Sequence, residues 1–76
     1  MKAYILIKVR SGEVKTVVNE LRKLKDVVEA NMTFGPYDAV VVMEASDIGL
    51  LGSLIASSIQ SIPGVDQTLT CIAVDI

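Results

Sequence analysis

Tyr37 and Asp38 are the side chains of this 76-residue chain whose types and spacing first suggest chemistry. They follow Gly35-Pro36 between the apolar runs 27–34 and 39–45, which predicts the tip of a β-hairpin. A turn that only reversed the chain would need Gly or Pro, but neither an aromatic residue nor an acid. A carboxylate beside a phenol could act as a base with a hydrogen-bond donor, or could hold a polar ligand.

Catalysis finds little support in the rest of the sequence. The chain has no His, which removes the commonest metal ligand and the side chain best suited to proton transfer near neutral pH. Its single cysteine, Cys71, is expected to be buried as a small apolar side chain. We therefore expect no catalytic residue, no metal and no cofactor. A small dimeric α+β enzyme with Asp38 as its base is kept as a minor alternative.

The charge and hydropathy of the chain exclude two classes of partner. Its formal net charge of -2 lacks the concentrated excess of Lys and Arg that a nucleic-acid binder needs, so we expect no direct contact with nucleic acid. The apolar run at the N-terminus is interrupted by Lys8 and Arg10 and is too short to span a bilayer. A cytoplasmic protein without a membrane partner is the expectation, and the lone thiol fits a reducing compartment.

The elements that must position the hairpin tip follow from hydrophobic periodicity. Residues 3–9 read as a strand, and apolar residues at helical spacing predict an amphipathic helix from Val14 to Leu24. After the hairpin, Ser46 and Asp47 offer N-cap oxygens to a second helix that runs to about Ser61. Residues 65–75 supply the last strand. The order β-α-β-β-α-β predicts one α+β domain over residues 1–76, with a four-stranded antiparallel sheet and two helices on one face, the ferredoxin-like plan.

The predicted strands are apolar on both faces. In the first strand Ala3, Ile5 and Ile7 point one way, whereas Tyr4 and Leu6 point the other. The two helices cover one face only, and a bare apolar sheet would exceed the patch that a soluble monomer normally exposes. We therefore expect a homodimer that pairs through the open faces of its sheets.

Four sequence pieces in this order resemble one known family. They are the element order, the Gly-x-Tyr-Asp tip, the link Ile62-Pro63-Gly64-Val65 and the opening of the last strand at Thr68-Leu69-Thr70. Together they are similar to the effector-binding domain of Lrp/AsnC-type transcription regulators, also called the regulation-of-amino-acid-metabolism module. The helix-turn-helix domain of those regulators has no counterpart here, so the chain is expected to be the stand-alone form of the module, without a DNA-binding domain.

The resemblance implies a ligand, an assembly and a set of site residues. It implies that dimers assemble into octamers or decamers, that a small amino acid binds between dimers, and that full-length Lrp/AsnC-type regulators are further partners. Asp38 would meet the ammonium group, and backbone amides at the tip would meet the carboxylate. The residues implied to bind the ligand are Gly35, Tyr37, Asp38, Thr68, Thr70, Met32 and Thr33.

Plainer roles stay open for each of these residues. Gly35-Pro36 could be only a turn, Asp38 could bond the backbone of its own turn, and the threonines could be ordinary strand residues. Three functions therefore remain: a regulatory module that senses an amino acid through ligand-dependent assembly, a structural oligomerisation scaffold without a ligand, and the minor enzyme.

Overall fold

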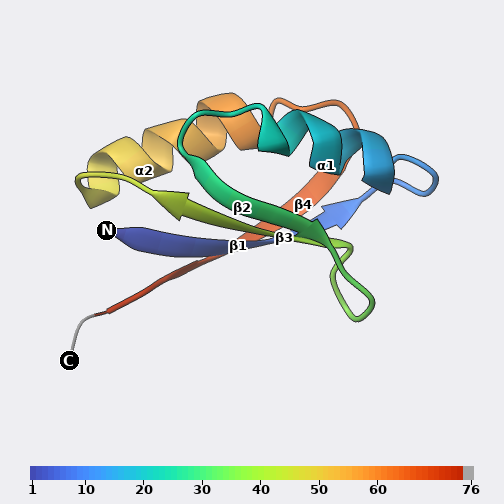
Figure 1. Cartoon of the computed structure of the whole chain (residues 1–76), viewed down its shortest axis with the longest axis horizontal. Coiled ribbons are helices and arrows are strands. Elements are labelled where there is room, and N and C mark those ends of the chain that lie inside the picture. Colours follow the sequence, from blue (N-terminus) through green and yellow to red (C-terminus); the bar gives the residue numbers. More distant parts are fainter. Residues whose placement is uncertain (75–76) are drawn as a thin grey trace.

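The computed structural model describes residues 1–74, which form a single sheet with helices on one side (Figure 1). In chain order the elements are β1 (Lys2–Val9), α1 (Val14–Arg22), β2 (Val27–Met32), β3 (Ala39–Glu44), α2 (Ile48–Leu54), the π-helical turn η1 (Ile55–Ile59) and β4 (Val65–Ile72). The predicted element order and the ferredoxin-like α+β plan are confirmed.

The strands lie in the order β2-β3-β1-β4, and each neighbouring pair is antiparallel. β1 and β3 are therefore the two central strands, and β2 and β4 are the two edge strands. Both helices lie on the same face of this sheet (Figure 1). Each edge strand has a helix beside it, and two of the hollows described below lie between an edge strand and its helix.

The centre of the sheet shows the alternation that the sequence predicts. Ile5 lies opposite Val41 of β3 on one side and Thr70 of β4 on the other, and Ile5 and Val41 are fully buried beneath the helices. Within residues 1–74 the core contains apolar side chains only. The charged residues of β1 point to the other face or lie at a strand end. The core residues are Ala3, Ile5, Ile7, Val9, Val17, Val18, Leu21, Ala30, Ala39, Val41, Met43, Leu51, Ile55 and Ile59.

The opposite surface of the sheet, here called the outer face, is also apolar. Leu6 lies between Val40 and Leu69, and Tyr4 lies between Val42 and Cys71, so these six residues form adjoining rows across three strands. No described segment covers them, and Leu69 is 49% exposed. The expectation that Cys71 is buried is wrong for the single chain, because its position in β4 turns it to this uncovered face.

The first helix is held in place by its buried stripe and by a close backbone approach. Val17, Val18 and Leu21 pack into the core, as the helical spacing predicts. Gly64, in the turn before β4, has φ of +99°, and a Cβ at this position would lie 3.0 Å from Val17 Cγ2. A side chain here would collide with α1, so glycine lets the turn pack directly against the helix.

The second helix differs from its prediction in one respect. Asp47 caps it as expected, because Asp47 Oδ1 accepts a hydrogen bond of 2.8 Å from the amide of Leu50. The helix is not a continuous α-helix to Ser61: from Ile55 it widens into a π-helical turn, where the amide of Gln60 donates to the carbonyl of Ile55. Both Ile55 and Ile59 lie in this turn and are buried in the core.

Two strands end earlier than the sequence predicts. β2 stops at Met32 and not at Phe34, whose side chain is fully exposed beside the Gly-Pro turn. β4 ends at Ile72, so residues 73 and 74 are not in the strand as predicted, and the last predicted position, residue 75, lies outside the described residues. Across residues 1–74 the longest helical stretch falls short of the length needed to cross a membrane.

Candidate functional site

Asp38 at the hairpin tip is tied into the sheet. Its Oδ2 accepts a hydrogen bond of 2.8 Å from the amide of Val9, and its own amide donates to the carbonyl of Ile7 at 2.9 Å. Its carbonyl accepts from the amide of Thr33 at 3.0 Å. These contacts with two other segments make Asp38 a joint between the tip and the end of β1.

The other tip residues surround a shallow hollow of about 320 Å³ on the outer face, here called the tip hollow. The hydroxyl of Thr33 donates to the carbonyl of Tyr37 at 2.8 Å and thereby fixes the loop. The Nζ of Lys8 lies 5.9 Å from the centre of the Tyr37 ring. Among the described residues, no acceptor is bound to the amides of Gly35 and Tyr37, so both remain available to a carboxylate. The lining residues are Leu6, Thr33, Phe34, Gly35, Pro36, Tyr37 and Val40.

A second hollow, of about 230 Å³, lies on the helix side of the sheet between α2, η1 and the edge strand β4. We call it the α2–β4 groove. The helices contribute apolar or small side chains, and β4 contributes Thr70 and Ile72. Among residues 1–74, no charged side chain lines it. Its lining residues are Ile48, Leu51, Gly52, Ile55, Ala56, Gln60, Thr70 and Ile72.

The α2–β4 groove has a polar end and an apolar end. At the polar end Gln60 Nε2 donates to Thr68 Oγ1 at 3.0 Å, and Thr70 lies two residues further along the same face of β4. This contact leaves Gln60 Oε1 free to accept a hydrogen bond and both threonine hydroxyls free to donate. At the other end of the groove Ile48 lies beside Ile72. The helix therefore runs antiparallel to β4, and the groove changes from polar to apolar along its length.

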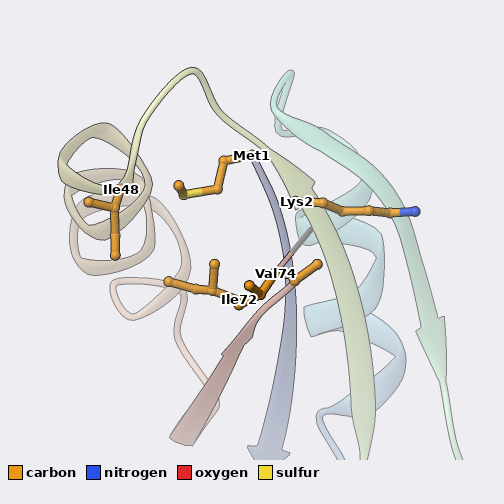
Figure 2. A pocket seen from close by; sticks show the side chains of 6 residues that line it. Met1, Lys2, Ile48, Ile72 and Val74 are labelled. Carbon is orange, nitrogen blue, oxygen red and sulfur yellow. The ribbon is translucent and has the colours of Figure 1, made fainter. Parts of the chain in front are cut away.

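The apolar end opens into a larger hollow of about 550 Å³, here called the terminal hollow, which shares Ile48 and Ile72 with the groove. Figure 2 shows Met1, Ile48 and Ile72 around this space, and it shows the side chain of Lys2 directed away from it. The Nζ of Lys2 lies 5.6 Å from the Tyr4 ring, on the outer face. The Met1 ammonium donates to the carbonyl of Ala45 at 2.7 Å. The wall of the terminal hollow is therefore formed mainly by carbon and sulfur atoms.

Met32 lines none of the three hollows described so far. It lines a separate groove of about 290 Å³ between α1 and the edge strand β2, together with Lys15, Asn19 and Arg22. The Nε of Arg22 donates to the carbonyl of Ala30 at 2.9 Å and so protects the free edge of β2. Strand alternation explains the separation, because Met32 lies opposite Ala39 and turns to the helix side of the sheet.

One chain therefore does not bring all of the sequence-predicted ligand residues together. Gly35, Tyr37 and Thr33 line the tip hollow on the outer face, whereas Thr70 lines the α2–β4 groove on the helix side. Thr68 lies at the polar end of that groove through its bond to Gln60. Sequence reasoning missed Gln60, because its approach to β4 depends on the π-helical turn, which no periodicity in the sequence announces. Within residues 1–74, no cluster of three or more His, Cys, Asp or Glu could hold a metal ion.

Known proteins share both this sequence and this fold. The FL11 transcriptional regulator of Pyrococcus horikoshii, of the helix-turn-helix type, is 39% identical over 72 residues, which are 95% of this chain and 47% of the regulator. E. coli AsnC superposes with a TM-score of 0.92 at 25% identity, covering 99% of this chain and 51% of AsnC. This chain thus spans about half the length of the curated relatives that it matches.

A third comparison comes from a ligand complex. The Neisseria meningitidis transcriptional regulator NMB0573, solved as a complex with L-Met, superposes with a TM-score of 0.87 at 16% identity, covering 97% of this chain and 49% of that one. At that identity the likeness establishes the fold alone. A family match covers residues 2–76 of this chain. The chain belongs to the Lrp/AsnC ligand binding domain family.

Proposed function

We propose that this domain is a regulatory module that binds a small amino acid and changes its assembly in response, and so modulates transcription regulation or amino-acid metabolism. The α2–β4 groove carries the proposal. It is open to solvent, and at about 230 Å³ it is smaller than the pockets of about 300–1,000 Å³ that hold drug-sized molecules. Family membership and the L-Met complex of the Neisseria relative support an amino acid as the ligand.

The polar end of the groove matches the two charged groups that all amino acids share. Gln60 Oε1 would accept from the ammonium group, and the hydroxyls of Thr68 and Thr70 would donate to the carboxylate. A hydrogen bond to a charged group contributes about 1.5–3 kcal/mol, so these three side chains suffice for weak to moderate affinity. The ligand's charges remain near solvent, because Thr70 and Gln60 are exposed in the single chain.

A second copy of the chain would complete the site. The free amides of Gly35 and Tyr37 are donors for a carboxylate, and Asp38 keeps one carboxylate oxygen available beyond its bond to Val9. These groups lie on the other face of the sheet from the α2–β4 groove, so they reach its ligand only from a neighbouring copy. Binding between copies is the simplest way in which a small molecule could alter assembly.

The outer face supports a homodimer as the building block. Its six apolar residues, together with the neighbouring polar rim, are uncovered in the single chain, and like faces pair about a two-fold axis. Dimers would then assemble further, into an octamer or decamer, or with full-length Lrp/AsnC-type regulators. The module is proposed to have no enzymatic activity, and its curated relatives are transcriptional regulators.

Isothermal titration with each of the twenty amino acids tests this function, with native mass spectrometry run on the same samples. We expect saturable binding by at least one amino acid and a shift in mass distribution that corresponds to a coupling of about 1–3 kcal/mol. Thr70→Val removes one hydroxyl from the groove and should abolish the signal, whereas Thr16→Val, on the exposed side of α1, should not. Silence across the whole panel would favour the ligand-free scaffold.

A further inference from the structure

We infer that the groove between α1 and β2 binds a small organic dicarboxylate, at a site separate from the proposed amino-acid site. This α1–β2 groove, of about 290 Å³, is lined by Lys15, Val18, Asn19, Arg22 and Met32. It lies at the β2 edge of the sheet, whereas the α2–β4 groove lies at the β4 edge. The two sites can therefore be occupied independently.

The polar wall of the α1–β2 groove is a row of donors on one face of α1. Lys15, Asn19 and Arg22 follow one another at spacings of four and three residues, so they lie on the same side of the helix. Lys15 and Arg22 are about 10 Å apart along the helix axis, at a rise of about 1.5 Å per residue. Their long side chains can close on a ligand that has a carboxylate at each end, with the Asn19 amide as a further donor between them.

Neither cation of the groove is neutralised within residues 1–74. The neighbouring Lys23 pairs with Glu20 at 3.1 Å, whereas Lys15 and Arg22 form no ion pair with a described carboxylate. Among these residues, no Asp or Glu lines the groove. A dicarboxylate would therefore bring one negative charge to each of the two cations and would meet no described like charge in the groove.

A hydrogen bond to the edge strand holds Arg22 in place. Its Nε donates to the carbonyl of Ala30 at 2.9 Å, which orients the guanidinium plane and leaves Nη1 and Nη2 as donors for a carboxylate. The same bond occupies an outward carbonyl of β2. An extended acidic peptide would compete for that carbonyl in order to pair with the edge strand. The groove therefore favours a small molecule over a peptide.

The apolar part of the groove favours an organic ligand over an inorganic ion. Val18 is buried at its base, and the side chain of Met32, which is 57% exposed, forms the wall on the β2 side. An inorganic ion would leave these apolar surfaces uncovered, whereas the carbon chain between two carboxylates would pack on them. The volume lies just below the range of about 300–1,000 Å³ that holds drug-sized molecules, which suits a smaller metabolite.

Titration of the whole chain with matched probes tests the inference. Glutarate has a carboxylate at each end of a short carbon chain, butyrate keeps one carboxylate, and glutaramide keeps none. Glutarate should bind about fivefold or more tightly than butyrate or inorganic phosphate, and glutaramide should give no signal. In two-dimensional NMR spectra, glutarate should shift the amide signals of α1 and β2 and leave those of Thr70 and Ile72 in place.

Two matched variants test whether the groove itself binds the probe. Lys15→Gln removes one charge from an exposed side chain that makes no hydrogen bond or ion pair among residues 1–74, so the fold should be unaffected. Its affinity for glutarate should fall about fivefold, to the level of butyrate. Lys25→Gln makes the same change in charge just beyond α1 and outside the groove, and should keep the wild-type affinity.

Three results would overturn the inference. Equal losses of glutarate affinity in Lys15→Gln and Lys25→Gln would show attraction to the overall charge and not a site. Shifts at Thr70 and Ile72 in place of α1 and β2 would put the anion in the other groove. Silence with glutarate, together with binding of an acidic peptide, would make the groove a docking surface for protein segments. Glutarate binding at α1 and β2 without binding of any amino acid would remove the proposed function and leave this site standing.

Discussion

The carboxylate of Asp38 accepts a hydrogen bond from the amide of Val9, with 2.8 Å between Asp38 Oδ2 and Val9 N. The two residues are 29 positions apart in the sequence, and the bond joins the hairpin tip to the last residue of β1. With the bond from the Asp38 amide to the carbonyl of Ile7, it closes the end of the sheet. Asp38 therefore has a structural role in the folded chain, whether or not its second oxygen also meets a ligand.

Asp38→Ala should destabilise the fold by about 1–3 kcal/mol, because the partly buried amide of Val9 loses a charged acceptor. Asp38→Asn keeps an acceptor oxygen at the same place and should lose less. The free energy of unfolding from urea titration measures both effects, and hydrogen exchange at the Val9 amide reports the bond directly. Equal stability of the wild type and the alanine variant would show that the bond contributes nothing.

The sequence around Asp38 predicts local structure but not the long-range bond of its carboxylate. The tip and the faces of β1 follow from Gly35-Pro36 and from period-two alternation, which are local signals. The bond from Asp38 to Val9 is not local. The sequence interpretation allowed Asp38 a bond within its own turn, but no spacing rule pairs residues from strands that meet only after the fold is complete.

The candidate site was predictable to a smaller extent for the same reason. Thr68 and Thr70 share a face of the last strand, as their spacing predicts, and the structure places both beside the groove. Met32 was expected to line the ligand pocket together with Tyr37, but strand pairing turns it to the α1 side. Gln60 escaped notice because an α-helix and a π-helical turn leave the same pattern of apolar residues over so few positions.

Gly64→Ala should destabilise the fold by about 1–3 kcal/mol. Its φ of +99° is strained for alanine, and the new Cβ would lie 3.0 Å from Val17 Cγ2 in the packed interface with α1. Gly52→Ala is the matched control, since Gly52 lies in α2 and its added Cβ meets no atom within 4 Å. That change should be neutral or stabilising by up to about 1 kcal/mol, through helix propensity. Thermal unfolding of the two variants in parallel measures the difference. Equal losses of stability would show that the close packing of Gly64 against Val17 is not what requires glycine there.

Asp47→Ala should remove the N-cap of α2 and cost about 1 kcal/mol, because the amide of Leu50 loses its acceptor at 2.8 Å. Ser46→Ala, one residue earlier, should have little effect, since the cap bond comes from Asp47 alone among the described residues. The sequence offered both residues as caps, so this pair of variants separates them. Urea titration followed by far-ultraviolet circular dichroism gives the two free energies. A larger loss of stability in Ser46→Ala than in Asp47→Ala would show that Asp47 is not the N-cap.

Leu6→Lys should convert the proposed dimer to a monomer. Leu6 lies at the centre of the outer face, between Val40 and Leu69, so a two-fold contact through this face would bury the new ammonium group in each of the two copies. Burial of an unpaired charge costs several kcal/mol, which exceeds what most single apolar contacts contribute. Leu50→Lys adds the same charge on the helix side, where it is 45% exposed, and should leave the mass unchanged. Light scattering at micromolar concentration measures the mass of each chain in solution. A wild-type chain with the mass of one copy would eliminate the sheet-to-sheet dimer. A Leu6→Lys chain that keeps a dimeric wild-type mass would place the contact on another surface.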